Sequence, residues 1–344
     1  MLLTDRTRIE ADWTCPRKRY WLTEYQRTGI VPANQPTVLT FGIVVHEGLE
    51  HLTTHDDWEA AVTHMKSLPE WGALDQDQQW LARAQVIGFA VEVWPAWKQQ
   101  YEKVALEQEL EFEHHGVLYM VRPDVLLRDR KTGDLWYPDY KTFSGWTNRK
   151  WSYALQQQLT IVACERATGE KIVGSWIQGL SKGTTRNGRL YHPLVYAYRK
   201  AGSPGLYVTQ YATKRKAGFE RYPTVQFTDG SPSKAIHAWA LWVKKHDPDV
   251  LSNLFPRTAP IFVKAEMMQA FLEQRTKREK EIAAATARIE LFPQTFSACE
   301  STYGTCPYLD ACWVPTVTRD PIGRGYYVPR EPHHAAETTV FKTR

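Results

Sequence analysis

The placement of the cysteines constrains the fold of this 344-residue chain more than any other feature of its sequence. Cys15 lies near one end, whereas Cys299, Cys306 and Cys312 cluster near the other. Four thiolates can hold zinc or an iron-sulfur cluster, and the spacing alone does not choose between the two. If the four cysteines share one site, the helix around Cys15 must pack against the C-terminal segment. Such a site would join the two ends of the chain.

The fifth cysteine and the composition indicate an ordinary globular interior. Cys164 follows the apolar helical stretch 159–163, where a free thiol behaves as a small hydrophobe, so we predict that it is a buried core residue. An odd number of cysteines without a secretory signal argues against a disulfide framework. The first residues carry frequent charges, and no stretch is long and apolar enough to span a membrane. We therefore expect a soluble, cytoplasmic protein.

Hydrophobic periodicity predicts a helical first third, followed by strands, a helix and a further strand. The predicted helices cover 15–25, 40–53, a segment from 56 onward, 77–102, 152–168, 233–245 and 264–289. The predicted strands cover 104–112, 116–127, 134–141 and 171–180, with a turn at 131–134. This order favours an α/β fold in which helices flank a small mixed sheet. Charges in the helix 264–289 indicate a mostly solvated amphipathic face.

Two acidic residues lie on neighbouring predicted strands. Asp124 follows Pro123, and Asp139 begins an Asp-x-Lys triplet that ends at Lys141. Side chains two positions apart share one face of a strand, so the carboxylate and the ammonium lie together, and the intervening Tyr140 carbonyl can also face a metal ion. Hard divalent ions require such oxygen ligands. A lone Asp-x-Lys triplet is most often a surface ion pair, so its neighbours must decide its meaning.

A third candidate group lies upstream, on the predicted helix 40–53. His46 and Glu50 are one helical turn apart and therefore share a face. Gly42, one turn before His46, would allow a neighbouring element to approach closely. A single helical histidine is usually an ordinary surface or core residue. His46 is a candidate site residue only in combination with the acidic residues further along the chain.

The series Gly-x-x-x-His, Pro-Asp, Asp-x-Lys and a glutamine-bearing helix resembles the RecB-like PD-(D/E)XK nucleases. The resemblance implies a restriction-endonuclease-like mixed sheet flanked by helices. It also implies that His46, Asp124, Asp139 and the Tyr140 carbonyl bind one or two Mg or Mn ions, and that Lys141 is catalytic. Glu50 becomes an outer or additional ligand.

The family also carries a catalytic glutamine, often in the pattern Gln-Leu-x-x-Tyr. Gln157 and Gln158 are the candidates, and Gln158 is favoured because Leu159 follows it. Val162 stands where the tyrosine would be. A glutamine on a helix surface is the alternative, because glutamine is a good helix former.

The C-terminal cysteines extend the resemblance. The pattern Cys-x-x-x-Tyr-Gly-x-Cys-Pro-Tyr-Leu-Asp-x-Cys, preceded by Phe292-Pro293 and Phe296, is similar to the ending of cluster-bearing RecB-like nucleases. These include phage enzymes, the AddB helicase-nuclease subunit and CRISPR-associated exonucleases. The resemblance implies that Cys15, Cys299, Cys306 and Cys312 hold a structural 4Fe-4S cluster, with zinc as the alternative.

The resemblance covers nearly the whole chain and predicts one RecB-like nuclease domain over 1–325. Its parts are a helical layer (1–103), a catalytic core (104–181), a basic insertion (182–232), a lobe of helices and cysteines (233–325), and a polar tail (326–344).

The basic insertion is a candidate surface for nucleic acid. Between residues 182 and 221 there are nine Lys and Arg against one acid, interleaved with tyrosines. Backbone charge and base stacking favour such a mixture, although a solvated hairpin is an equally simple reading. The predicted DNA contacts are Lys182, Arg186, Arg189, Lys214, Arg215 and Lys216.

These features predict a Mg- or Mn-dependent deoxyribonuclease, with an exonuclease expected, that leaves a 5′-phosphate in recombination, repair or phage and defence DNA processing. The expected partners are single- or double-stranded DNA and a helicase, recombination or defence complex in a prokaryotic cell or phage-infected host. Two alternatives stay open: a catalytically inactive DNA-binding or scaffold subunit with the same fold, and a zinc-stapled DNA-binding module.

Overall fold

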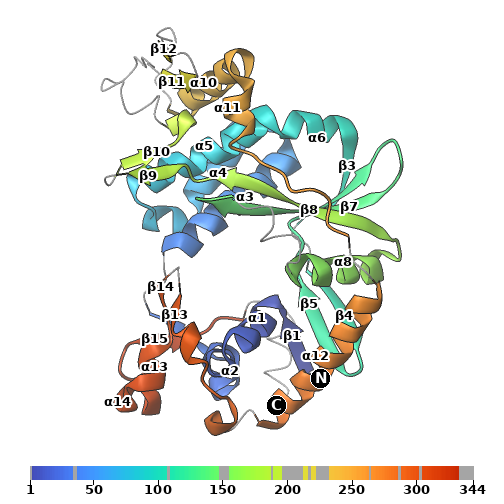
Figure 1. The fold of residues 1–344 in the computed structure, drawn as a ribbon, viewed down its shortest axis with the longest axis vertical. Helices are drawn as coiled ribbons and strands as arrows, with labels where there is room; N and C mark the ends of the chain where they lie inside the picture. The colour runs from blue at the N-terminus through green and yellow to red at the C-terminus, as the bar shows by residue number, and fades with distance from the viewer. Residues whose placement is uncertain are drawn as a thin grey trace.

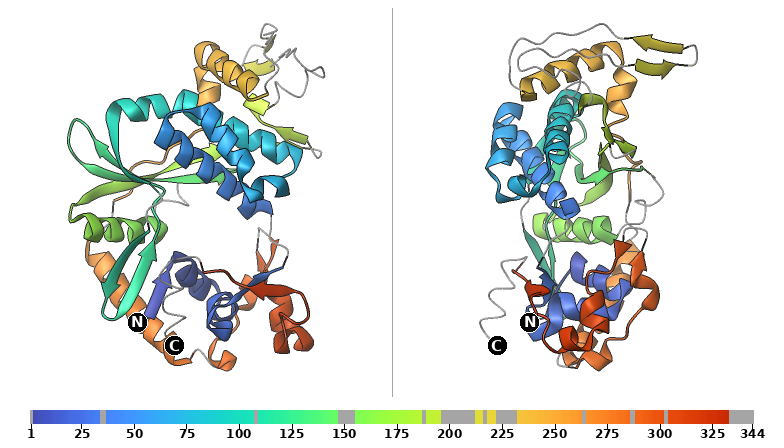
Figure 2. Two further views of the ribbon diagram at one scale, coloured as in Figure 1. Left: turned by 180° about the vertical axis from the view of Figure 1, so that it is seen from behind. Right: turned by 90° about the vertical axis from the view of Figure 1, so that its left-hand side faces the viewer.

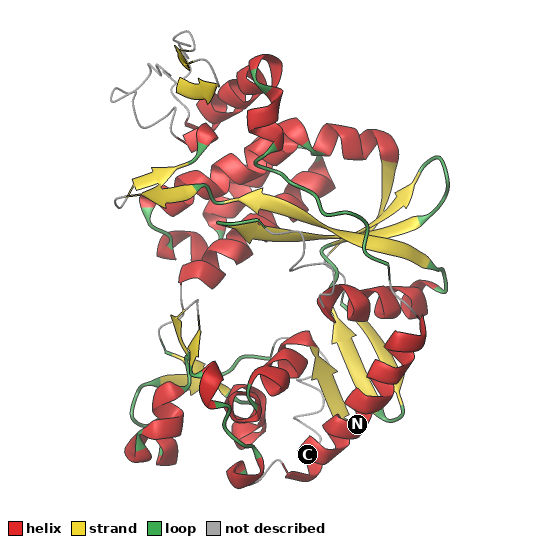
Figure 3. Cartoon of the chain, viewed as in Figure 1, coloured by secondary structure: helices red, strands yellow, loops and turns green. Residues whose placement is uncertain are grey.

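The structure is a computed structural model, shown in Figure 1 and Figure 3. It describes residues 2–33, 37–106, 109–146, 155–186, 189–195, 212–215, 218–221, 232–262, 265–285, 288–301 and 304–332. The fold is mixed α/β, as the sequence predicted. Among these residues, no helix has the length and apolar character that crossing a membrane requires.

The central sheet has four strands in the order β3-β6-β7-β8. They are β3 (Tyr101–Leu106), β6 (Val125–Asp129), β7 (Leu135–Phe143) and β8 (Ile172–Ser181). The first three form an antiparallel meander, and β8 runs parallel to β7 after a crossover through α8 (Leu155–Thr168). The predicted turn before β7 is confirmed: Asp129 accepts hydrogen bonds from the N–H groups of Lys131 and Thr132, and Gly133 has a φ of 79°.

Helices cover both faces of this sheet (Figure 2). On one face, Tyr140 packs into a core formed largely by α3 (Thr37–His55), α5 (Gln76–Glu92) and α10 (Pro232–His246). On the other, Tyr137 packs with Ile161 and Cys164 of α8. Because successive strand residues alternate between faces, β7 presents different side chains to the two layers. The predicted burial of Cys164 is confirmed.

Further helices complete the first layer. They are α4 (Trp58–Ser67), the 3-10 turn η3 (Pro69–Ala73), α6 (Trp94–Gln100) and α11 (Pro248–Ser252). Asp57 caps α4, and Asp75 caps α5 in a reciprocal capping box with Gln78. The glycine that permits close helix packing is Gly48, where an added Cβ would lie 2.5 Å from Met65 Sδ. By contrast, no described atom lies within 4 Å of such a Cβ at Gly42, which corrects our expectation.

A second sheet, β1-β5-β4, lies apart from the first in Figure 1. It comprises β1 (Leu2–Asp5), β5 (Val117–Val121) and β4 (Leu110–His114). It packs against α8 and, through β1, against α12 (Ala265–Ala285). The predicted strand 116–127 is therefore two strands in different sheets, because Pro123 cannot donate a ladder hydrogen bond. Strand β1 was not predicted.

The N- and C-terminal segments form a third region. From the N-terminal side come α1 (Arg6–Thr14), α2 (Pro16–Arg19), the π turn η1 (Tyr20–Glu24), η2 (Tyr25–Arg27) and β2 (Ile30–Pro32). From the C-terminal side come η4 (Ile289–Leu291), η5 (Phe296–Ala298), β13 (Glu300–Ser301), β14 (Gly304–Thr305), α13 (Leu309–Trp313), α14 (Pro315–Arg319) and β15 (Tyr327–Pro329).

The predicted start of the polar tail at residue 326 is wrong, because the next residues form a paired strand. Strand β15 pairs antiparallel with β2, and Tyr327 is buried. The ordered chain therefore continues beyond residue 325, where we had expected the tail to begin. The single helix predicted over 15–25 is also interrupted, since α1 ends at Thr14 and α2 starts with Pro16, whose ring is tolerated at a first helical position.

Helix α12 is more buried than its sequence indicated. The predicted solvated residues Glu273, Lys277, Lys280 and Glu281 are exposed. The opposite face, however, buries a network of charges. Glu279 contacts Arg275 on the same helix and Arg19 of α2 at 3.0 Å, while Arg275 reaches Asp12 of α1 at 2.8 Å. This network ties the N-terminal helices to α12 through paired, buried charges.

Candidate active site

Two of the predicted residues meet at the open end of the β6–β7 pair. These strands pair only at Leu127↔Trp136 and Arg128↔Leu135, and then diverge. Asp124 lies in the gap, where its Oδ2 accepts a hydrogen bond from the Tyr140 N–H at 2.6 Å. The carboxylate thus satisfies a backbone donor that a longer ladder would have paired. The predicted convergence of Asp124 with the Asp-x-Lys strand is present.

His46 approaches the same carboxylate from α3. Its Nδ1 lies 3.4 Å from Asp124 Oδ1, and its ring meets that of Tyr140 edge-on, with centroids 6.0 Å apart. Asp124 is therefore contacted on one oxygen by the histidine and on the other by the strand. Helix α3, whose apolar side packs in the main core, fixes where His46 lies.

Asp139 and Lys141 form a buried ion pair on the α8 side of β7. Lys141 Nζ lies 2.6 Å from Asp139 Oδ2, and the Asp139 side chain is wholly buried. Tyr137, two positions earlier on the same strand face, donates its hydroxyl to Asp139 Oδ1 at 2.9 Å. The pair is therefore not the surface ion pair that commonly explains an Asp-x-Lys triplet.

For each of the two aspartates, burial acts to raise the pKa of the carboxyl and nearby positive charge acts to lower it. Burial raises the pKa of the Asp139 carboxyl, and the nearby Asp124 adds to this, while Lys141 opposes it without reversing the shift. Burial also acts to raise the pKa of Asp124, but His46, Lys141 and the Tyr140 N–H outweigh it, so that this pKa is lowered. Two adjacent buried carboxyls in such different environments are typical of functional sites.

The pKa of His46 responds to the same Asp124 carboxylate. Burial acts to lower the pKa of His46, but the Asp124 carboxylate and its hydrogen bond raise it above the ordinary value. Glu50, the expected outer ligand, has a pKa raised by burial and by the neighbouring Glu47, with Arg122 opposing. The charged groups that act on Glu50 come from α3 and from other elements, and neither aspartate is among them.

The structure places the two candidate glutamines differently. Gln157 is wholly buried, and neither of its amide atoms has a hydrogen-bond partner among the described residues. Gln158 is only partly buried. Gln157 lies one turn before Thr160, whose hydroxyl interacts with that of Tyr137, so its helix face turns towards the site. This geometry favours Gln157 over Gln158, while the catalytic role of either remains a prediction.

Two neighbours of the site were missed by sequence reasoning. Tyr137 could have been found, since a strand with period two places residues 137, 139 and 141 on one face. Arg6 could not, because its charge reaches Asp139 and Tyr137 from α1, more than a hundred residues away in the sequence.

The donor chemistry of the site suits a divalent cation. Two buried carboxyls repel each other, and Lys141 and His46 supply the compensating positive charge in the present arrangement. A cation among these oxygens would take over that compensation. As they stand, however, no three His, Cys, Asp or Glu side chains in the described parts of the chain are arranged to hold a metal ion.

The four predicted cysteines lie in one region. Cys306 experiences the charges of Cys15 and Cys299, and Cys312 those of Cys306 and Cys15. All five cysteines are free thiols. Burial is the main cause that raises the pKa of the Cys306 and Cys312 thiols, with the neighbouring thiols adding to it.

Backbone contacts hold this region together. The Thr295 N–H donates to Cys15 Sγ at 3.4 Å, and the Cys306 N–H donates to the Cys299 carbonyl at 2.8 Å. Arg17 donates its Nε–H to the Phe292 carbonyl at 2.7 Å. Thiolates are the donors that zinc and iron-sulfur clusters prefer. As placed, the described cysteines do not form a group that could hold a metal ion.

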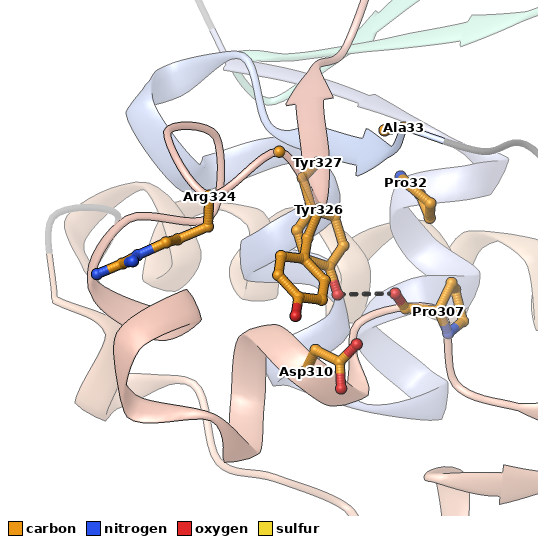
Figure 4. A pocket seen from close by; sticks show the side chains of 8 residues that line it. Pro32, Ala33, Pro307, Asp310, Arg324, Tyr326 and Tyr327 are labelled. Carbon is orange, nitrogen blue, oxygen red and sulfur yellow. Dashed lines mark hydrogen bonds between the residues drawn. The ribbon is translucent and has the colours of Figure 1, made fainter.

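A pocket of about 310 Å³ lies beside the cysteine segment (Figure 4). Within it the Tyr327 hydroxyl donates to the Pro307 carbonyl at 2.9 Å. The pocket therefore marks where β15 closes over the segment between Cys306 and Cys312. Its lining residues are Pro32, Ala33, Pro307, Asp310, Arg324, Gly325, Tyr326 and Tyr327.

The predicted DNA-binding residues are placed only in part. Lys182 follows β8, and its ammonium lies 4.8 Å from the centre of the Phe41 ring; burial lowers its pKa. Arg186 ends β9 (Thr184–Arg186) and pairs with Arg189 at the start of β10 (Arg189–Tyr191). Lys214 and Arg215 belong to β11 (Ala212–Arg215), which pairs with β12 (Gly218–Arg221). Lys216 lies outside the described residues.

No protein-family model matches the sequence, and no curated protein matches it.

Proposed function

We propose that this chain is a metal-dependent DNA nuclease of the RecB-like PD-(D/E)XK type. The observation that carries the proposal is the wholly buried Asp139 carboxylate, 2.6 Å from the Lys141 ammonium and electrostatically coupled to Asp124. Titratable groups whose pKa values are shifted by burial and by specific charge partners occur preferentially at functional sites. The antiparallel meander, crossover helix and parallel fourth strand supply the mixed sheet that the resemblance implies.

In this proposal Asp124, Asp139, His46 and the Tyr140 carbonyl would hold Mg or Mn. The ion, when bound, would neutralise charge on the phosphate and activate water. The chain's own contribution is orientation: the Tyr140 N–H fixes one oxygen of Asp124, and the Tyr137 hydroxyl fixes one oxygen of Asp139. Each carboxylate then has its second oxygen directed towards His46 or Lys141.

Lys141 is the proposed catalytic cation. Its ammonium lies 2.6 Å from Asp139 Oδ2 and carries three N–H donors, which can reach the attacking water or the phosphate. A lysine carries a compact ammonium on a flexible side chain, so it can move towards the negative charge that develops on the phosphate during cleavage. The expected product carries a 5′-phosphate.

We also propose that Cys15, Cys299, Cys306 and Cys312 hold a 4Fe-4S cluster, with zinc as the alternative. Phosphodiester hydrolysis needs no electron transfer, so the centre would be structural and would fasten the N-terminal helices to the C-terminal segment. Visible absorbance distinguishes the two: an iron-sulfur protein is brown, whereas zinc thiolates are colourless.

The test is cleavage of end-labelled single- and double-stranded DNA by anaerobically purified protein, with Mg, with Mn and with EDTA. Asp139→Asn and Lys141→Ala should each lower the metal-dependent rate by at least about 100-fold. Asp134→Asn is the matched control, because Asp134 immediately precedes β7, at the far end of the same strand, and bonds only within the turn.

Normal cleavage by Lys141→Ala would refute the assignment of the site. Wild-type protein that binds DNA but does not cleave it with either metal would instead identify an inactive scaffold. The end label also reports whether cleavage is exonucleolytic, and from which end.

A further inference from the structure

Three histidines and a glutamate gather where α3 packs against α4 (Figure 1). Glu47, His51 and His55 follow one another at intervals of four on α3 and therefore share one face of that helix. His64 comes from α4, and its Nε2 lies 3.2 Å from Glu47 Oε2. The centre of the His51 ring lies 4.3 Å from that of His55 and 4.8 Å from that of His64. Three imidazoles and a carboxylate thus meet at one place.

The packing of the two helices brings these side chains together. Gly48 lies so close to α4 that an added Cβ would stand 2.5 Å from Met65 Sδ. These two residues are the sequence neighbours of Glu47 and His64, so the close approach brings the carboxylate and the imidazole into contact. Asp57 caps the first turn of α4 and fixes where that helix begins. The donors therefore come from two helices whose separation is set by core packing.

The side chains of this group are open to a ligand. Those of His64 and Glu47 are 33% and 38% exposed, and His55 is exposed. His51 is partly exposed, but its Nδ1 is buried and has no hydrogen-bond partner in the part of the chain that the structure describes. A buried ring nitrogen without a partner is uncommon in a folded protein. An ion bound to this imidazole would account for it.

We propose that Glu47, His51, His55 and His64 bind one divalent transition-metal ion, for which Zn is the probe. Imidazole nitrogens with one carboxylate oxygen form a donor set that zinc prefers, whereas Mg is bound through oxygen ligands. Two histidines four positions apart on one helix are a recurrent zinc-binding arrangement. The proposal goes beyond the nuclease proposal and does not depend on it, because it uses neither the residues of the aspartate site nor the cysteines.

The rings must turn to bind the ion. As placed, the His51 and His64 rings are stacked with an interplanar angle of 23°, and no three side chains of the described residues are arranged to hold a metal ion. The second side-chain torsion of histidine is broad, so a ring can rotate about it at little cost. A tetrahedral ion with Zn–N bonds of about 2.0–2.1 Å holds two ring centres roughly 5 Å apart. The present separations of 4.3 and 4.8 Å are close to this, so ring rotation forms the site without a movement of the helices.

The experiment titrates Zn into the full-length protein in excess Mg and measures the number of ions bound and their affinity by calorimetry. His55→Ala and His64→Ala each remove one donor, from different helices. Each should weaken the binding of one Zn ion at least about 100-fold, since even an outer-shell partner of a metal ligand contributes about 10–100-fold. The cysteines and aspartates are the same in all these proteins, so only the difference between them reports on this site. Zn should also raise the unfolding temperature of the wild type more than that of either variant.

The matched control is His115→Asn. His115 is exposed, and its ring centre lies 4.3 Å from that of His114, the same separation as between His51 and His55. The two are sequence neighbours at the end of β4 rather than residues of two packed helices. Asparagine tolerates the φ of 49° at this position. The control should bind Zn as the wild type does, and unchanged unfolding temperatures without Zn would exclude a general loss of structure in any variant.

Loss of one Zn ion in both His55→Ala and His64→Ala, with the control unchanged, would support the site. Equal affinity and stoichiometry in the wild type and these two variants would overturn it. An equal loss in His115→Asn would also overturn it, because the binding would then be adventitious binding to surface histidines. A loss in His55→Ala alone would reject a site shared by two helices. None of these outcomes depends on DNA cleavage, so the nuclease proposal is tested separately.

Discussion

The aspartate site and the cysteine region are assembled in contrasting ways. Asp124, Asp139 and Lys141 come from one hairpin, and only His46 is brought from a distant helix. The cysteine region joins Cys15 to residues near the opposite end of the chain. Closing a long loop costs more chain entropy than closing a hairpin, so the second site needs a stronger source of stabilisation than the first.

The structure provides that stabilisation in two forms. One is the set of buried charges around Glu279 and Arg275, which links α12 to α1 and α2. The other is the group of four thiols, with its own hydrogen bonds. The comparison therefore predicts large stability effects in one region and mainly kinetic effects in the other.

The largest expected effect is on the cysteine region. Cys306→Ser should remove the proposed metal centre and lower the free energy of unfolding by about 10 kcal/mol, the scale of structural thiolate sites. Iron and zinc content, visible absorbance and thermal unfolding measure this. Cys164→Ala is the control: it should retain the metal and cost only about 1 kcal/mol of core packing. Equal metal content in Cys306→Ser would show that the thiols do not form the centre.

The buried charges should come next. Glu279→Gln leaves Arg19 and Arg275 without their shared carboxylate and should destabilise the protein by about 3–5 kcal/mol in urea unfolding. Glu281→Gln changes an exposed glutamate on the same helix and should stay within about 0.5 kcal/mol of wild type. Similar losses in the two variants would mean that the network contributes no more than a surface charge.

A buried histidine outside both regions should give a pH-dependent effect. Burial lowers the pKa of His192 to about 4 from 6.5, so the unfolded chain binds the proton more tightly. The free energy of unfolding should therefore fall by about 3 kcal/mol on account of His192 as the pH is lowered from 6.5 towards 4, and this stability should be fully present above pH 6.5. His192→Asn should flatten this acid limb in urea unfolding, whereas replacement of exposed His115 should not. If the wild type and both variants lose stability equally as the pH falls, His192 is not the group responsible.

The smallest of these effects is expected at Tyr137, a neighbour of Asp139 in the aspartate site. Tyr137→Phe removes the hydroxyl that donates to Asp139 at 2.9 Å and should lower kcat about 10-fold with little change in KM, since Tyr137 positions a carboxylate and does not touch DNA. Tyr326→Phe, at an exposed tyrosine, is the control. A change confined to KM, or an equal change in the control, would argue against this positioning role.

Local patterns were sufficient for most elements of the fold. The helix 40–53, the turn 131–134 and the strands 134–141 and 171–180 correspond closely to α3, the β6–β7 turn, β7 and β8. Boundaries failed where proline interrupted a continuous pattern, at Pro16, Pro95 and Pro123. They also failed at β1, a short strand whose parallel pairing with β5 depends on residues more than a hundred positions away.

The sequence by itself determined which candidate side chains lie together on one element, because spacing along a strand or helix places Asp139 beside Lys141 and His46 one turn from Glu50. Tertiary structure alone decided that Asp139 is wholly buried and that Gln157 rather than Gln158 faces the site. The physical reason is that burial and electrostatic contact depend on distances between elements far apart in the chain, which local periodicity does not encode.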